Sequence, residues 1–312
     1  MHSGQTSLEP SSSGRLLIVD GHAYAYRAFY AIRSLNSPSG TPTNAIYSFI
    51  RMLAKIRTRL QPTHSAVIWD GGLAPERMTL LPGYKAQRPE MPPALAGQLD
   101  QIVDFLRASS VFSYMKEAAE ADDYIAAIAR KAETAGMDVV IASSDKDFMQ
   151  LVSPHVRLLN PNDKTETLWG ADDVKRKSGV EPTQIVDWLS LTGDAVDNIP
   201  GVPGIGAKTA SSLLTRFQSI DELFRRLAEV QSEVLRANLQ ASIDLVGRNQ
   251  QLVRLHCQEP CEFSLEDLAV KPADTEALRG LFSKWGFRTL LRELGPARET
   301  AADLFGNEMG AR

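Results

Sequence analysis

Three short apolar runs, each followed by acidic residues, constrain the fold more strongly than any other feature of the sequence. The runs cover residues 16–19, 66–69 and 139–142, and their shortness and branched side chains are typical of buried strands. Between them, apolar residues recur at helical spacing over residues 46–60 and 121–135. Strands that alternate with helices predict a mostly parallel sheet with helices on both faces.

The rest of the chain divides into a proline-rich connection and a helical second half. Thr43 is a possible cap for the first helix, and Gly136 ends the second. Residues 71–93 carry five prolines and three basic residues, and a loop of this length is usually functional or disordered. After about Thr183 strand signals fade, and helices are predicted over residues 184–191, 207–217, 220–227, 232–255 and 277–292.

Acidic residues follow each of the three predicted strands. Asp20 and Asp70 come directly after the first two strands, and Asp145 and Asp147 follow the third. Ligands of parallel α/β sheets bind outside the carboxyl ends of the strands. If the three strands are neighbours, these four carboxylates converge on one edge of the sheet.

Two further acidic groups are spaced three residues apart. Glu120 and Asp123 share a face of a helix's first turn, with Asp122 beside them, and Asp194 and Asp197 repeat the spacing. For any single residue, a role in helix capping or in the helix dipole is the stronger interpretation. The whole set favours a metal site, because a bound cation removes the repulsion among crowded carboxylates. Carboxylates without His or Cys suit Mg²⁺ or Mn²⁺, and such sites typically serve phosphoryl chemistry.

Several segments, in order along the chain, carry a specific resemblance to a known family. The longest covers residues 193–210 and includes Gly-Asp-Ala-Val-Asp-Asn-Ile-Pro-Gly. The others are Val-Asp-Gly (19–21), Tyr-Arg-Ala-Phe (26–29), Tyr-Lys-Ala-Gln-Arg-Pro (84–89), Glu-Ala-Asp-Asp (120–123) and Asp-Lys-Asp (145–147). From about residue 15 to 294 the chain resembles the 5′-nuclease domain at the N-terminus of bacterial DNA polymerase I and, more distantly, the flap endonucleases.

The resemblance implies two metal sites that hold Mg²⁺ or Mn²⁺, and all nine positions of the family pattern are acidic here. The first site would be served mainly by Asp20, Asp70, Glu120, Asp122 and Asp123. The second would draw on Asp145, Asp147, Asp194 and Asp197, some of them through water. The ions would activate a water and stabilise charge on the attacked phosphodiester. The five histidines, His22 among them, are expected to be incidental.

The resemblance also implies contacts with DNA. Arg27, Lys85 and Arg88 would contact phosphates near the scissile bond, and the connection over residues 71–93 would form an arch for a 5′ single strand. Exposed basic residues are usually only solvated, and the proline-rich connection is what favours the DNA contact. Tyr84 could stack on a base or pack at the base of the arch, and the sequence favours neither.

A glycine-rich turn before a predicted helix resembles the hairpin of helix–hairpin–helix DNA-binding elements. Gly204 and Gly206 would let backbone N–H groups face a phosphate, and Lys208 would add a charge-assisted contact. These groups read no base edges, so binding is expected to follow DNA structure rather than sequence. In the family the same hairpin holds K⁺ through backbone carbonyls, which here would be those of Gly201, Val202 and Ile205.

Two positions depart from the family pattern. Ser144 stands where the family usually has Gly, which affects how closely the backbone there can approach a partner. Asn44 also replaces a usual Gly, near the start of the first long helix. Asn tolerates unusual backbone angles better than most residues, so a mild effect is expected.

The composition is compatible with this reading. The 312 residues are 43% hydrophobic and 23% charged, and the formal net charge is −4. Without the nine clustered carboxylates the remainder is mildly basic, and two divalent cations would compensate part of the cluster. Cys257 and Cys261 are too few for a zinc site or a disulfide scaffold, and no apolar run is long enough to span a membrane. A cytoplasmic protein is therefore expected.

We therefore expect an α/β, PIN-like nuclease core in residues 15–180, with the arch at about 71–93. A helical DNA-binding region with a helix–three-turn–helix motif is expected in residues 181–295, and flexible tails in 1–14 and 296–312. The expected function is a monomeric, metal-dependent 5′→3′ exonuclease and flap endonuclease. Its substrates would be DNA with 5′ ends, flaps or RNA primers, and a separate DNA polymerase and ligase would act with it.

Two other functions remain open from the sequence. A ribonuclease on a related carboxylate fold would explain the acids but not the helical half with its hairpin. A non-catalytic protein that binds DNA junctions would explain the hairpin but not the complete acidic set.

Overall fold

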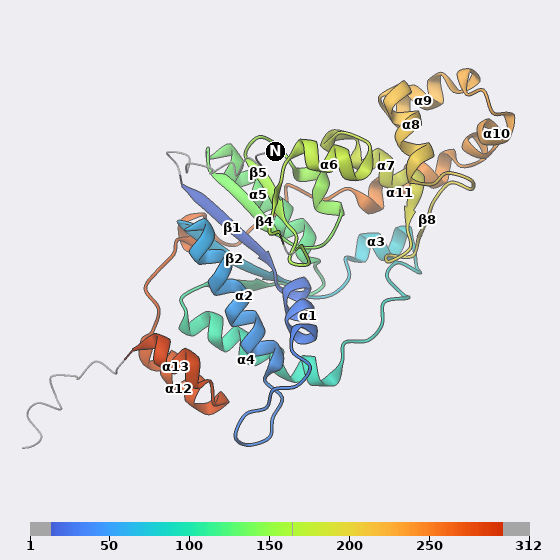
Figure 1. Cartoon of the computed structure of the whole chain (residues 1–312). Helices are drawn as coiled ribbons and strands as arrows, with labels where there is room; N and C mark the ends of the chain where they lie inside the picture. The colour runs from blue at the N-terminus through green and yellow to red at the C-terminus, as the bar shows by residue number, and fades with distance from the viewer. Residues whose placement is uncertain (1–13, 164, 296–312) are drawn as a thin grey trace, which may run out of the picture.

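A six-stranded sheet lies at the centre of the molecule in the computed structural model, which describes residues 14–163 and 165–295 (Figure 1). Its strands are β1 (Arg15–Asp20), β2 (His64–Trp69), β3 (Phe112–Met115), β4 (Asp138–Ala142), β5 (Val156–Leu159) and β6 (Leu168–Trp169). The order across the sheet is β3-β2-β1-β4-β5-β6, and every neighbouring pair is parallel except β5 and β6. The prediction of a mostly parallel sheet is confirmed.

The two faces of the sheet bury separate sets of apolar side chains. Leu16 and Ile18 of β1 belong to one buried cluster, and Leu17 and Val19 belong to the other, because side chains alternate along a strand. Helix α5 (Ala121–Thr134) covers the first face. The second face is covered by α1 (Gly21–Ala31), α2 (Asn44–Leu60) and α4 (Pro93–Ala108).

Short helices and one small hairpin make up most of the remaining chain. After β4 come η1 (Asp147–Leu151), α6 (Ala171–Ser178), η2 (Pro182–Gln184) and α7 (Ile185–Thr192). The hairpin pairs β7 (Gly193–Asp194) with β8 (Ile199–Pro200). The later helices are α8 (Ala207–Phe217), α9 (Ile220–Arg225), η3 (Leu227–Glu229), α10 (Glu233–Ala241), α11 (Ile243–Val253), η4 (Glu266–Leu268), α12 (Thr275–Trp285) and α13 (Arg288–Leu294).

Two of the predicted helices are interrupted in the structure, and a third ends early. The helix predicted over residues 232–255 is broken at Ser242, which lies between α10 and α11. The helix predicted over residues 277–292 is broken at Gly286, whose φ of 74° is left-handed and ends α12. The helix predicted over residues 220–227 ends at Arg225.

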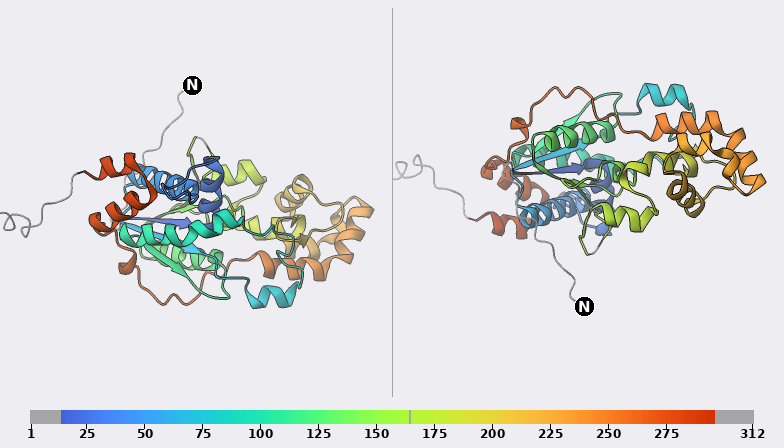
Figure 2. Two further views of the ribbon diagram at one scale, coloured as in Figure 1. Left: turned by 90° about the horizontal axis from the view of Figure 1, so that it is seen from below. Right: turned by 90° about the horizontal axis from the view of Figure 1, so that it is seen from above.

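The last two helices lie far from the other late helices. Figure 2 shows α8 to α11 in gold and orange at one end of the molecule and α12 and α13 in red at the other. Leu278, Phe282 and Leu290 join the cluster on the α4 side of the sheet, and the indole of Trp285 donates to Gln101 Oε1 at 2.7 Å. The chain after α11 therefore returns to the sheet.

Residues 71–93 are more ordered than a plain loop. Pro75–Leu80 forms a short helix, α3, with proline at its start. This helix was not predicted from the sequence. Arg77, Tyr84 and Lys85 are buried, so this connection packs against the body of the protein at several points. Its later part is more exposed over residues 86–90, and the chain then leads into α4.

Asn44 does not adopt an unusual backbone angle. Its φ is not positive, and the residue is helical and buried at the start of α2. Its amide donates to the carbonyls of Phe29 and Ile32, and its oxygen accepts from Gln98 of α4 at 3.1 Å. Thr43 is at the cap position but makes no side-chain cap; Gln98 Oε1 instead accepts from the first backbone N–H groups of α2.

Candidate active site

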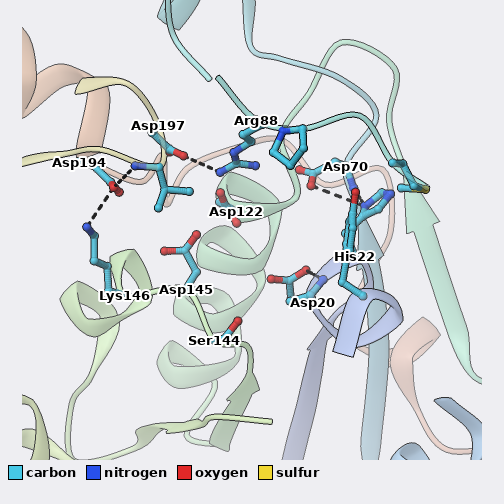
Figure 3. Close-up of a pocket in the computed structure, with 15 residues that line it drawn as sticks. Asp20, His22, Asp70, Arg88, Asp122, Ser144, Asp145, Lys146, Asp194 and Asp197 are labelled. Atoms are coloured by element: carbon cyan, nitrogen blue, oxygen red, sulfur yellow. Dashed lines mark hydrogen bonds and ion pairs between the residues drawn. The ribbon is translucent and has the colours of Figure 1, made fainter. Parts of the chain in front are cut away.

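The three strand-end aspartates come together because their strands are neighbours. Strand β1 lies between β2 and β4, so Asp20, Asp70 and Asp145 emerge at one edge of the sheet. Figure 3 shows these carboxylates facing one cavity. The cavity is lined by six aspartates in all: Asp20, Asp70, Asp122, Asp145, Asp194 and Asp197.

Asp20 combines the two roles that the sequence left open. Its Oδ1 accepts from the backbone N–H of Ala23 at 3.0 Å and caps α1. Its Oδ2 accepts from the Ser143 hydroxyl at 2.7 Å, while the residue still lines the cavity. Burial raises the pKa of Asp20 to about 6, although both hydrogen bonds act in the opposite direction.

Asp70 is held by the acid-bearing helix and by a histidine. Its Oδ1 accepts from the backbone N–H of Ala121 at 2.8 Å, which ties β2 to the start of α5. His22 Nδ1 accepts from the Asp70 N–H at 3.2 Å and lies 3.6 Å from Asp70 Oδ2. The His22 ring also packs edge-on against Trp69. His22 therefore has defined partners beside the cavity, and the expectation that it is incidental to the chemistry stays a prediction.

Three acids place oxygens close enough together to hold a cation. Single carboxylate oxygens of Asp147, Asp194 and Asp197 all lie within 4.8 Å of one another. Asp147 Oδ1 is buried and has no hydrogen-bond partner among the described residues. Burial and the charge of Asp145 raise the pKa of Asp147 well above the usual aspartate value. A buried oxygen without a donor, in a group of oxygen ligands, fits a hard divalent cation.

Basic side chains lie among the carboxylates. Lys146 Nζ is 3.1 Å from Asp194 Oδ1, and Arg88 Nη2 is 2.6 Å from Asp197 Oδ1 (Figure 3). Lys85 Nζ is 2.6 Å from Glu120 Oε2. Burial would lower the pKa of Lys85, but the surrounding carboxylates outweigh it and raise that pKa, so the ammonium stays charged. The cluster is therefore partly neutralised by side chains of the chain itself.

Three of the nine predicted acids do not line the cavity: Asp147, described above, and Glu120 and Asp123. Glu120 accepts from the Ala74 N–H and from the Tyr84 hydroxyl, in addition to its contact with Lys85. Asp123 is paired with Arg77. Neither residue is among those that line the cavity.

The predicted DNA contacts occupy different environments. Arg27 is half-buried, and its Nε donates to the Pro161 carbonyl at 3.4 Å. Arg88 is at the cavity. Tyr84 is 3% exposed and its ring is packed in the core, so in this structure it packs and does not present its ring for stacking on a base. Lys85 is also buried.

The glycine-rich turn leads into α8 as the sequence suggested. Gly204 has φ of 77°, and Gly206 occupies the cap position of α8. Lys208 in the first turn of α8 is exposed. Of the three predicted carbonyls, that of Val202 accepts from the Ile205 N–H at 3.0 Å.

Three polar residues that line the cavity had been given no role from the sequence: His22, Tyr26 and Lys146. The sequence did contain signals for them. His22 and Tyr26 are four residues apart on α1 and so share one face of that helix, and Lys146 lies between two of the acids.

Comparisons with known proteins agree with the fold and the cavity. A family model described as the 5′-3′ exonuclease N-terminal resolvase-like domain matches residues 15–179, and the 5′-3′ exonuclease C-terminal SAM fold matches residues 180–276. A 5′-3′ exonuclease of Aquifex aeolicus is 36% identical over 280 residues, covering 89% of this chain and 94% of the relative. DNA polymerase I of Bacillus caldotenax is 37% identical over 282 residues, or 90% of this chain. The chain spans about a third (32%) of that polymerase's length.

Solved structures support the fold. A structure of T5 5′-exonuclease with bound zinc has a TM-score of 0.66 at 23% identity and covers 90% of this chain and 98% of its own. The catalytic core of Rad2 with DNA substrate has a TM-score of 0.56 at 15% identity and covers 90% and 91%. At these identities the likeness concerns the fold alone.

A parallel sheet with an oxygen-lined acidic cavity at its carboxyl edge, followed by a helical region, defines a nuclease of the metal-dependent kind. The two consecutive family matches make the assignment more specific: this chain belongs to the 5′-3′ exonuclease family. The prediction of that family from the sequence is confirmed. No helix among the described residues is long and apolar enough to cross a membrane.

Proposed function

We propose that this chain hydrolyses DNA phosphodiesters near 5′ ends and at the base of 5′ flaps, with Mg²⁺ or Mn²⁺ bound at two sites. The observation that carries the proposal is the convergence of six aspartates on one cavity. The match to the Aquifex 5′-3′ exonuclease supports the proposal, because it covers 94% of that protein.

The cavity offers two groups of ligands. The first would be Asp20, Asp70 and Asp122, with Glu120 close behind them. The second would be Asp145, Asp147, Asp194 and Asp197, three of which already place oxygens within 4.8 Å of one another. When bound, two such ions supply a Lewis acid on each side of an in-line displacement and a water of lowered pKa.

The chain's own residues would position the DNA strand and balance charge. Arg88 and Lys146 lie at the cavity and are paired with Asp197 and Asp194. When divalent cations satisfy those carboxylates, both basic groups become free to bind phosphate oxygens. Tyr26 also lines the cavity and offers an aromatic face to a base, a contact that is indifferent to sequence.

The duplex would be held away from the cavity by the start of α8. Gly204, Gly206 and Lys208 would face a backbone phosphate there, and Arg27 is proposed to contact a phosphate as well. K⁺ at the carbonyls of Gly201, Val202 and Ile205 belongs to the same proposal. The proposal also includes a role in RNA-primer removal, together with a separate DNA polymerase and ligase. The protein would be a monomer in the cytoplasm, and the free thiols of Cys257 and Cys261 support that location.

The decisive experiment uses a 5′-labelled flap duplex and the matching single strand. Each is incubated with the protein and Mg²⁺, and with EDTA or the Asp145→Asn variant as controls. Cleavage at the flap base that disappears in both controls is the expected result.

The same assay separates the proposal from its two rivals. Tight binding of the flap without cleavage in Mg²⁺ or Mn²⁺ would leave a protein that only binds junctions. Cleavage of an RNA strand of the same sequence, with the DNA flap left intact, would identify a ribonuclease.

A further inference from the structure

Arg77 is a buried guanidinium at the meeting point of three separate segments. It lies on α3, is 2% exposed, and uses its planar fork to bind Asp123 of α5: Nη1 donates to Oδ2 at 2.7 Å, and Nη2 donates to Oδ1 at 2.9 Å. Two further bonds reach the end of α11 and the residue after it. Nε donates to the Leu252 carbonyl at 3.1 Å, and Nη2 donates to the Arg254 carbonyl at 3.3 Å.

Both oxygens of Asp123 are occupied by protein donors. Besides the two bonds from Arg77, Oδ1 accepts from the His256 N–H at 2.8 Å, and the residue is 5% exposed. Its neighbour Asp122 lines the acidic cavity, whereas Asp123 does not. Two adjacent acids in one helical turn therefore face different partners, because successive residues point about 100° apart around a helix.

We infer that Arg77 and Asp123 form a buried structural ion pair that anchors the first turn of α5 to α3 and to the end of α11, and that Asp123 is not a ligand of the metal ions. The inference rests on the proposed function, since it divides labour within the proposed metal site. Arg77 Nη1 also lies 3.3 Å from Glu120 Oε2, so the same guanidinium holds a second acid of that turn. The pair fixes α3, α5 and the end of α11 relative to one another.

A metal ligand and a member of a structural ion pair give opposite results on substitution. Removing a metal ligand from a crowded acidic site weakens metal binding, and relieves repulsion in the metal-free protein. Removing one member of a buried ion pair leaves the other charge uncompensated and destabilises the fold. Replacing both members by apolar side chains of similar volume is often tolerated.

The first test compares Asp122→Asn with Asp123→Asn, which make the same chemical change at adjacent positions. The measurements are the melting temperature in EDTA and the Mn²⁺ dissociation constant by calorimetry. We expect Asp122→Asn to weaken Mn²⁺ binding about tenfold or more without lowering the melting temperature. We expect Asp123→Asn to lower the melting temperature by at least about 6 °C, with Mn²⁺ binding changed less than about threefold.

The second test is a cycle of Asp123→Leu, Arg77→Met and the double variant. The double variant should recover at least about half of the melting temperature lost by Asp123→Leu, and should bind Mn²⁺ like the unmodified protein. If a single variant does not fold, Mn²⁺ binding by the double variant still tests whether Asp123 is a ligand.

Two results would overturn the inference. One is Asp123→Asn that loses Mn²⁺ affinity as Asp122→Asn does while keeping its melting temperature. The other is a double variant that shows no recovery or no Mn²⁺ binding while the unmodified protein binds Mn²⁺. Neither readout requires DNA cleavage, so a failure of the flap assay would be recognised separately.

Discussion

Asp20 caps a helix with one oxygen and receives a serine hydroxyl on the other, while lying at the floor of an acidic cavity. A capping role and a metal role are thus compatible for one carboxylate. Burial raises the pKa of Asp20 from 3.8 to about 6, and the charges of Asp70 and Asp145 add to the shift. The folded protein therefore binds a proton at Asp20 in a pH range where the unfolded chain has released it.

The raised pKa makes Asp20 a source of pH-dependent instability in the metal-free protein. Because the folded pKa lies above the unfolded one, its contribution to the free energy of unfolding is lost as pH rises from about 4 to about 6. Asp20→Asn removes this loss and can keep the bond from Ala23. In EDTA, the free energy of unfolding of Asp20→Asn minus that of the unmodified protein should therefore increase as pH rises, by up to about 3 kcal/mol.

Urea unfolding at pH 4, 5, 6 and 7 measures that difference. The reference is Asp138→Asn, at the start of β4 and away from the cavity. A gap between Asp20→Asn and the unmodified protein that stays constant from pH 4 to pH 7 would contradict the argument.

Helix α2 begins without a cap of its own, and α4 supplies one from 50 or so residues away. Gln98 Oε1 accepts from Ala45 N–H at 2.9 Å and from Ile46 N–H at 3.3 Å, and its amide donates to Asn44. Gln98 is 1% exposed, so none of these partners could turn to water instead. The start of α2 is therefore fixed by tertiary structure.

Gln98→Leu keeps a similar side-chain volume but leaves buried donors and an acceptor without partners. We expect it to lower the free energy of unfolding by about 2–4 kcal/mol. Gln251→Leu, an exposed position on α11, is the matched control and should change it by less than about 0.5 kcal/mol. Equal effects in the two variants, measured by urea unfolding, would show that the cap is unimportant.

The β7–β8 hairpin carries Asp194 and Asp197 and depends on a glycine at its first position. Gly193 has φ of 70°, and an added Cβ would collide with the backbone of Ile199 and Gly201. We expect Gly193→Ala to weaken Mn²⁺ binding and flap cleavage at least about tenfold, because the hairpin must shift. Gly97→Ala, where a Cβ meets nothing, is the control; calorimetry that finds both variants alike would refute the prediction.

The sequence was informative where the signal was local and silent where the partner was distant. Asp20, Asp70 and Asp145 were predictable because each follows an apolar run, and strands of that kind share an edge. The break at Ser242 was not, because the apolar spacing continues through it. The partners of Asp123 were not predictable either, since Arg77 and His256 are far from it in sequence and become neighbours only through packing.

Charge distribution, rather than net charge, governs how a chain of formal charge −4 would bind DNA. Six aspartates line one cavity, and exposed basic residues such as Lys208 lie elsewhere. A phosphate contact contributes to binding by releasing a counterion, so it is measured by the salt dependence of binding.

Lys208→Ala should weaken flap binding in EDTA and reduce the slope of log K against log salt by about 1. Lys284→Ala, an exposed lysine on α12 at the other end of the molecule, is the matched control and should leave the slope unchanged. Fluorescence anisotropy at several salt concentrations measures both slopes. Parallel lines for Lys208→Ala and the unmodified protein would remove α8 from the proposed DNA surface.

The order of strands in the sheet has a consequence for folding. Asp20, Asp145 and Asp194 come from widely separated parts of the chain and meet only after β1, β4 and the hairpin are in place. The unfolded chain therefore contains no competing copy of the site, and a divalent ion acts as a ligand of the native state alone. At a concentration 100 times its dissociation constant, such an ion stabilises the fold by about 2.7 kcal/mol. Thermal unfolding with Mn²⁺ should shift upward accordingly, and the same chelator that stops cleavage should also shorten the lifetime of the folded protein.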